Sequence, residues 1–384
     1  MKPTGVGIIG PGAWASVSHI PVIAASPAFE LHAVSTSRRS SAEAAAAKYG
    51  VPGYDDHRRL LADPRVELVV VAVQVTQHFE LISAALQAGK MVYSEWPLAN
   101  GLAEAERLAE LARRAGARTV VGLQGRYAPE VQHAADLVRD GYVGEVLGTT
   151  LVGSGMVWGG EVDSHNQAYW FDNANGATPL TSATLHALDP LHFVLGEFDT
   201  VAANLVVGRK EATVTEDGSR IPVTVPDQVA LIGTLTSGAA ASVFYRGGAS
   251  RGENLRWEIN GTDGDLVLTS AWGNMQVAQL TLAGGRGADT TATTIEVPAS
   301  YSDGIPTDLA QTPAGSVARL YAQFARDLAD GTHTVSDFEH ALNRHRLIDA
   351  VERSSHTGVA RSLKGPTTGR RPGAGRPEQS ESMT

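Results

Sequence analysis

The sequence contains no cysteine. Disulfide bonds, thiolate nucleophiles and cysteine-based zinc sites are therefore excluded. Long apolar runs are also missing, since no stretch reaches the length of a membrane-spanning helix. Positive charge is scarce, because 31 Lys and Arg stand against 41 Asp and Glu and leave a formal net charge of −10. This balance argues against non-specific binding to nucleic acid. We expect neither a membrane nor a direct nucleic-acid partner.

The length and composition indicate a globular protein with more than one domain. The chain has 384 residues, 43% hydrophobic and 19% charged, which is too long for one ordinary core. It runs from Met1 into an expected strand near Val6, which leaves no room for a signal peptide, so we expect a cytoplasmic protein. We predict a dinucleotide-binding domain over 1–124, a substrate and oligomerisation domain over 125–364, and a flexible, Gly/Pro/Ser-rich tail over 365–384.

A glycine motif follows the first expected strand. Gly10-Pro11-Gly12-Ala13-Trp14-Ala15 reads G-x-G-x-x-A and precedes a helical pattern that Pro21 must end or kink. In a dinucleotide site the second glycine lets the backbone at the helix start approach a pyrophosphate. We therefore predict cofactor contacts from Gly10, Gly12, Ala13 and Trp14. The alternative is an ordinary glycine turn.

The end of the second expected strand suggests which dinucleotide is bound. NAD-selective sites usually end this strand with an acid that binds the ribose hydroxyls. Here the strand ends in Ser35-Thr36-Ser37-Arg38-Arg39, and hydroxyls with guanidinium groups suit a 2′-phosphate. Ser37 and Arg38 are the candidate ligands, and NADP is slightly preferred over NAD. The alternative is that both arginines are solvated.

The apolar pattern predicts an α/β protein with two sheets. Strand and helix patterns alternate to residue 124, and the Val/Leu run at 66–73 is typical of a strand buried on both faces, so we predict a doubly wound parallel Rossmann sheet. Later strands alternate apolar and polar residues and predict a mostly antiparallel open sheet with one covered face. These strands are expected at 146–152, 200–207, 228–236, 240–245, 255–260, 265–269 and 275–282. Helices are expected at 130–140, 178–195, 315–329 and 337–355.

Several motifs together carry a family resemblance. An apolar strand precedes His78, another strand leads into Glu95-Trp96-Pro97-Leu98-Ala99, and Asp337-Phe338-Glu339 begins the last helix. With the glycine motif, these stretches resemble the Gfo/Idh/MocA family (glucose–fructose oxidoreductase and inositol dehydrogenase) over almost the whole chain. Glu95-Trp96 and Gln124-Gly125-Arg126 most resemble a divergent branch, that of the fungal galactose-pathway repressor.

The resemblance implies a nicotinamide cofactor, a sugar-like substrate, and an open sheet that forms a homodimer or tetramer. It places His78 and Glu95 near the cofactor. Family enzymes usually carry a lysine in Glu-Lys-Pro and the Asp and His of Asp-x-x-x-His. Here the lysine position is Trp96 and the aspartate position is Ser182, while His186 matches the histidine.

His186 is the candidate catalytic residue, because imidazole titrates near neutral pH and can carry the hydroxyl proton. The alternative is a buried histidine with a structural role. Substrate-binding residues are predicted from the resemblance and from the aromatic and amide-rich segment 159–173, which suits a polyhydroxyl ligand. They are Trp96, Arg126, Tyr169 and Ser182.

Trp96 cannot act as a base, because its indole only donates a hydrogen bond. It would either stack on the sugar or nicotinamide, or only fill the volume of the lysine. A metal site is not expected, since helical spacing turns His192 away from His186.

Two functions remain open from the sequence. The first is an NAD(P)-dependent oxidoreductase that transfers a hydride between nicotinamide and a sugar-like alcohol or ketone. The second is a catalytically silent dinucleotide-binding regulator that acts through a protein partner. The first depends on the glycine motif and His186, and the second on the changes at Trp96 and Ser182.

Overall fold

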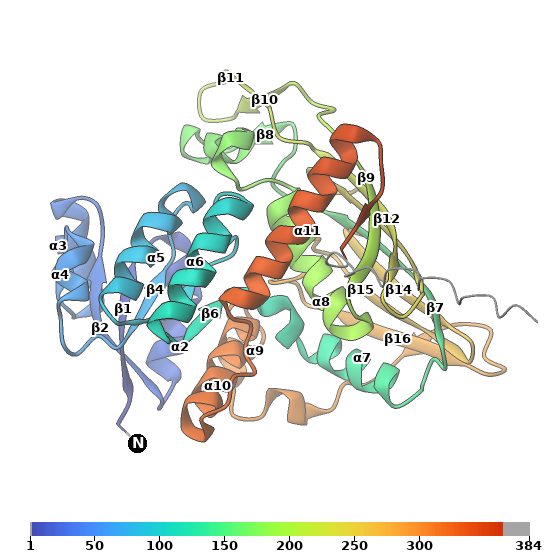
Figure 1. The fold of residues 1–384 in the computed structure, drawn as a ribbon, viewed down its shortest axis with the longest axis horizontal. Helices are drawn as coiled ribbons and strands as arrows, with labels where there is room; N and C mark the ends of the chain where they lie inside the picture. The colour runs from blue at the N-terminus through green and yellow to red at the C-terminus, as the bar shows by residue number, and fades with distance from the viewer. Residues whose placement is uncertain (1, 364–384) are drawn as a thin grey trace, which may run out of the picture.

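The computed structural model describes residues 2–363 and contains two large sheets, which lie side by side in Figure 1. The first sheet has the order β3-β2-β1-β4-β5-β6, and all its pairings are parallel. Its strands are β1 (Thr4–Ile9), β2 (Phe29–Ser35), β3 (Gly53–Tyr54), β4 (Leu68–Val71), β5 (Met91–Ser94) and β6 (Thr119–Val121). The strand order reverses between β1 and β4, and open α/β sheets bind ligands at such a reversal. The predicted Rossmann sheet is confirmed.

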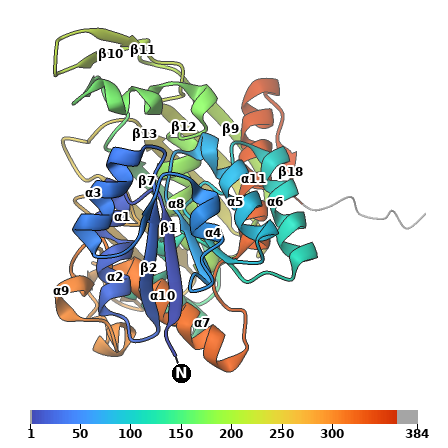
Figure 2. The same ribbon diagram turned by 90° about the vertical axis from the view of Figure 1, so that its left-hand side faces the viewer.

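Helices cover both faces of this sheet, as Figure 2 shows. They are α1 (Ala13–Val17), α2 (His19–Ala25), α3 (Arg39–Tyr49), α4 (His57–Leu61), α5 (His78–Gln87) and α6 (Leu102–Ala115). The first helical segment breaks at Ser18, whose hydroxyl donates to the Trp14 carbonyl at 2.7 Å. The break comes three residues before Pro21, because proline lacks an N–H and its ring crowds the preceding turn.

The second sheet has the order β17-β16-β15-β14-β7-β13-β12-β9-β18. Only the β7–β13 pairing is parallel, so the predicted, mostly antiparallel sheet is confirmed. Its strands are β7 (Val146–Ser154), β9 (Phe198–Val206), β12 (Gln228–Leu235), β13 (Ala240–Arg246), β14 (Leu255–Gly261), β15 (Gly264–Ser270), β16 (Thr281–Arg286), β17 (Thr293–Thr294) and β18 (Arg361–Ser362). Helices α7 (Pro129–Arg139), α8 (Leu185–Leu195) and α11 (Phe338–Thr357) lie on one face.

Two details of the second sheet differ from the sequence pattern. The expected strand at 275–282 is wrong, because β16 begins only at Thr281 and the preceding residues form a loop that buries Met275. A small sheet was missed, with the order β11-β10-β8. Its strands are β8 (Glu161–Val162), β10 (Glu211–Val214) and β11 (Arg220–Pro222), too short for a periodic signal.

The chain returns to the first sheet near its end. After the short α9 (Thr307–Ala310), helix α10 (Gly315–Asp330) packs with α2 and with the core formed by β1 and β2. Tyr321 and Phe324 of α10 are buried in that core. The division at residue 124 stays a prediction, but the core of the first sheet includes a helix from far beyond it. The predicted tail, 365–384, lies outside the described residues.

None of the helices within residues 2–363 is long and apolar enough to cross a membrane.

Candidate functional site: a dinucleotide cradle and a histidine

The two motif glycines form a cradle where β1 ends. Gly10 has φ +84°, and a Cβ added there would lie 2.5 Å from the Ala72 carbonyl oxygen of the β4 end. Gly12 faces open space, since an added Cβ would meet nothing closer than the Gly10 oxygen at 4.0 Å. Ala13 is exposed and begins α1, and the buried Nε1 of Trp14 has no partner among the described residues. The residues therefore fit a dinucleotide whose pyrophosphate approaches Gly12.

A pocket of about 750 Å³ extends from the cradle to the ends of β2 and β3. Ser37 and Arg38 line it, as predicted for a ribose or 2′-phosphate site. The Arg38 side chain has no hydrogen bond or ion pair with any residue in 2–363, whereas Arg39 pairs with Glu43 at 2.9 Å. Only the first of the two arginines is therefore available to a phosphate.

Sequence reasoning missed a second arginine in this pocket. Arg58, in the first turn of α4, is exposed and lines the pocket beside Arg38. Its side chain also lacks a partner among the described residues. The Asp55 and Asp56 side chains lie on the same rim, and Asp56 accepts from the Arg58 backbone N–H at 2.9 Å. The only sequence signal for Arg58 was its position shortly after β3, because β3 ends beside β2 in the parallel sheet.

The other end of the cradle lies after β5. A cis peptide joins Trp96 to Pro97, and the fully buried His78 ring faces two backbone oxygens nearby. Its Nδ1 is 2.8 Å from the Pro97 oxygen and its Nε2 is 3.1 Å from the Val73 oxygen. Burial lowers the pKa of His78. Both ring nitrogens face backbone oxygens of the chain, of which a neutral ring can donate to one. The predicted cofactor contact of His78 stays a prediction.

Glu95 is part of a buried chain of polar groups that sequence reasoning missed. Its Oε1 is 2.8 Å from Nε2 of His19, and Nδ1 of His19 is 2.9 Å from the Tyr321 hydroxyl. The only sequence signal for His19 was a histidine within an apolar helical stretch. The Glu95 side chain is 15% exposed at the sheet edge, consistent with the predicted position near the cofactor.

Trp96 packs in the core and is 6% exposed. Its Nε1–H donates to the Thr181 carbonyl at 2.6 Å, and its ring lies 4.9 Å from the His345 ring. Burial, aided by His78, lowers the pKa of His345 to about 3. The ring is buried against His345 and its one donor is occupied, which favours the volume-filling alternative over stacking on a sugar or nicotinamide.

The helix that carries His186 begins with an irregular turn. Leu180–Thr184 is π-helical and leads into α8, so Ser182 and His186 do not share one regular α-helix. Ser182 is partly exposed, and His186 is 6% exposed with a buried Nδ1 that has no partner among the described residues. Burial lowers the pKa of His186 to about 4, although the charges of Glu95 and Asp189 oppose the shift. His186 is therefore neutral at pH 7.

Arg126, predicted as a substrate ligand, is paired with a buried carboxylate. Its guanidinium binds both oxygens of the buried Asp189, at 2.7 and 2.6 Å, and lies over the Phe193 ring. His340 of α11 contacts the same carboxylate at 2.6 Å. Burial raises the pKa of Asp189, but Arg126 and His340 outweigh it and leave the pKa far below its usual value. Arg126 thus forms an ion pair between segments, and its predicted substrate contact stays a prediction.

Tyr169 lies in the 3₁₀ segment His165–Phe171, with its ring 5.2 Å from that of Trp170. Burial raises the pKa of the Tyr169 hydroxyl. Its predicted substrate contact stays a prediction. Within residues 2–363, no group of three His, Asp or Glu side chains is arranged to hold a metal ion.

This fold and cradle define a protein of the oxidoreductase type with a dinucleotide-binding Rossmann sheet. Residues 4–123 match the family model described as oxidoreductase family, NAD-binding Rossmann fold, and residues 129–270 match that of the Gal80p C-terminal domain. The dehydrogenase aclE of Aspergillus oryzae is 30% identical over 358 residues, which cover 88% of this chain and 90% of that protein. The chain belongs to the Gfo/Idh/MocA family.

Its relatives include regulators and sugar dehydrogenases. The galactose/lactose metabolism regulatory protein GAL80 of Saccharomyces cerevisiae is 27% identical over 73% of this chain and 70% of its own length. A crystal structure of a Gal80p super-repressor mutant has the same fold, with a TM-score of 0.83 and 24% identity over 94% of this chain and 98% of that one. Levoglucosan dehydrogenase of Pseudarthrobacter phenanthrenivorans is 28% identical over 70% of this chain and 74% of that protein.

Proposed function

We propose that the protein is a nicotinamide-dependent oxidoreductase that acts on a sugar-like alcohol or ketone. The observation that supports this most directly is the buried Nδ1 of His186, which has no hydrogen-bond partner among the described residues. The charge of Glu95 opposes the lowering of the His186 pKa by burial. Glu95 follows β5 at the same sheet edge as the glycine cradle. The similarity to aclE and to levoglucosan dehydrogenase favours the same class of reaction.

A bound nicotinamide accepts or returns a hydride. His186 performs the proton half of the reaction. As a neutral imidazole it accepts the proton of the substrate hydroxyl while the hydride leaves the adjacent carbon. The Glu95 charge stabilises the resulting imidazolium. Because a pKa of about 4 leaves little imidazolium at pH 7, the resting imidazole is in the form that accepts a proton.

The cofactor in this proposal is NADP in preference to NAD. Arg38 and Arg58 both line the ribose end of the pocket, and neither side chain has a partner among the described residues. A guanidinium binds a phosphate through two parallel hydrogen bonds. The Asp55 and Asp56 carboxylates on the same rim oppose this preference. We therefore expect the protein to use both cofactors, with NADP preferred.

A regulator without turnover is the second candidate. Trp96, at the lysine position, has its donor occupied by Thr181, and Arg126 is held by Asp189. Ser182 offers no carboxylate. The similarity to GAL80 favours a role through a protein partner.

Turnover decides between the two functions. Cofactor binding is measured by calorimetry with NADPH and NADH, and nicotinamide absorbance is then followed over a panel of sugars, polyols and ketoses. The oxidoreductase is supported if a substrate is found and His186→Ala lowers kcat at least about a hundredfold, while the exposed His356→Ala leaves kcat unchanged. Binding without turnover across the panel would favour the regulator. Turnover that survives in His186→Ala would reject His186 as the proton carrier.

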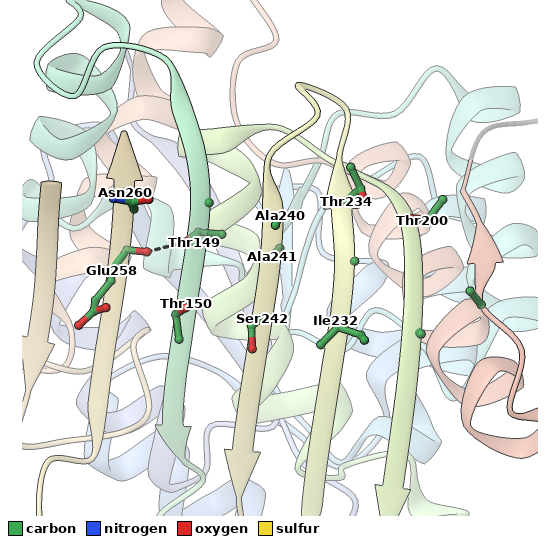
Figure 3. Close-up of a pocket in the computed structure, with 14 residues that line it drawn as sticks. Thr149, Thr150, Thr200, Ile232, Thr234, Ala240, Ala241, Ser242, Glu258 and Asn260 are labelled. Atoms are coloured by element: carbon green, nitrogen blue, oxygen red, sulfur yellow. Dashed lines mark hydrogen bonds between the residues drawn. The ribbon is translucent and has the colours of Figure 1, made fainter. Parts of the chain in front are cut away.

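We also propose that the protein is a homodimer or tetramer through the open face of the second sheet. Figure 3 shows this face, where Thr150, Ser242 and Ile232 project from adjacent strands around a hollow of about 610 Å³. Ile232 is 63% exposed, and Val152, Val206 and Phe244 on neighbouring strands of the sheet are also exposed. Large exposed apolar patches mark interaction surfaces.

Sedimentation velocity tests this interface. Ile232→Glu is expected to shift the protein to monomer, whereas Val17→Glu, an equally apolar exposed site on α1, leaves the mass unchanged. A wild-type monomer at tens of micromolar would reject the proposal.

A further inference from the structure

His19 connects two distant parts of the chain beneath the cofactor site. It lies in α2, its ring is fully buried, and both nitrogens are used. Nε2 is 2.8 Å from Glu95 Oε1 and Nδ1 is 2.9 Å from the hydroxyl of Tyr321, which lies 302 residues later in α10. Buried polar groups need such partners, because an unpaired one costs free energy.

Aromatic packing fixes the orientation of this ring. Tyr93 of β5 meets His19 edge to face at 4.9 Å and stacks on Tyr321 at 5.2 Å. His19 therefore has little freedom to rotate away from either hydrogen-bond partner.

The Glu95 carboxylate is held on one side only. Oε1 is bound by His19, whereas Oε2 has no hydrogen bond with any residue in 2–363. Gly122, just after β6, leaves room for this carboxylate, since an added Cβ would lie 3.0 Å from Oε1 and 3.2 Å from Oε2. The side chain is partly exposed at the carboxyl ends of the parallel strands, which is where dinucleotides bind in such sheets.

We propose that His19 is a positioning residue of the cofactor site. It holds Glu95 with its free oxygen toward the nicotinamide end, and Tyr321 of α10 holds His19 in turn. The proposal rests on the proposed cofactor site but not on turnover. Helix α10 is then part of the cofactor-binding unit, although this helix follows the second sheet in sequence.

The experiment measures the dissociation constants of NADP⁺ and NADPH by calorimetry. His19→Ala removes the donor to Glu95 and should weaken binding of both forms about tenfold. In His19→Gln the amide nitrogen can still donate to Glu95, so binding should be restored to within about fivefold of wild type. Tyr321→Phe removes the second partner of His19 and should weaken binding about threefold.

Unchanged affinities in His19→Ala and Tyr321→Phe would overturn the proposal. A lowered melting temperature with wild-type affinities would do the same, because His19 would then be only structural. If His19→Ala does not fold, Tyr321→Phe carries the test, since it removes a single oxygen. Binding without turnover rejects the oxidoreductase but leaves this inference standing, so the two failures are distinguishable.

Discussion

Replacing Trp96 by phenylalanine tests whether its indole N–H holds the turn that leads to His186. The ring is 6% exposed, and its Nε1–H is 2.6 Å from the Thr181 carbonyl within the π-helical turn. Phenylalanine keeps the ring packed against His345 but leaves that buried carbonyl without this donor. An unsatisfied buried carbonyl costs about 1–3 kcal/mol, and the smaller ring loses roughly another 1 kcal/mol of burial. We expect the free energy of unfolding to fall by about 2–4 kcal/mol.

The assay is denaturant unfolding followed by circular dichroism, with Trp257→Phe as the matched control. Trp257 is also buried, and its Nε1–H donates to the Thr149 hydroxyl at 2.9 Å in the second sheet. Both variants should lose similar stability, but only Trp96→Phe should lower kcat on any substrate found. A stability loss below about 0.5 kcal/mol would refute the hydrogen-bond argument. Equal kcat in the two variants would refute the link from Trp96 to His186.

Three further predictions follow from the cofactor site and the buried histidines. Arg38→Ala should weaken NADPH binding about tenfold and leave NADH binding unchanged, while Arg39→Ala, whose side chain is already paired, should change neither in calorimetry. Burial lowers the pKa of His186 to about 4 and of His345 to about 3. These pKa values lie below the unfolded value near 6.5, so the stability contributed by the two neutral histidines is fully present above pH 6.5 and is lost as pH falls toward 4. Replacing both histidines by Gln should flatten this pH dependence of the free energy of unfolding in denaturant titrations. Gly10→Ala should abolish cofactor binding. Residue 10 has φ +84°, and the new Cβ would lie 2.5 Å from the Ala72 carbonyl oxygen.

Local patterns were sufficient to predict the parallel sheet and the glycine cradle. Strand β4 is a run of four apolar residues that are all fully buried. Such a run can be recognised in the sequence without knowledge of distant segments. Gly10 and Gly12 lie within one turn, so strand, turn and helix can be identified together in the sequence.

Contacts between distant segments could not be predicted from the sequence. The partner of Arg126 is Asp189, 63 residues later, and a guanidinium beside a family motif looks the same whether it meets a substrate or a carboxylate. Tyr321 is 302 residues from His19. The run at 275–282 has strand-like composition, but Met275 is buried by packing within a loop. Tertiary packing decided each of these outcomes.

Two residues on the substrate side differ from the proton-handling residues of the family. Trp96 replaces the family lysine and gives its only donor to Thr181, and Ser182 replaces the family aspartate without adding a charge. The charge of Glu95, which His19 holds at 2.8 Å, opposes the lowering of the His186 pKa by burial. In the proposed oxidoreductase His186 therefore carries the proton, with Glu95 compensating its charge. A regulator needs neither a proton carrier nor a compensating charge. It would still need Glu95 held in place if cofactor binding is the signal. His19 and Tyr321 should thus matter under both functions, whereas His186 should matter only under the first.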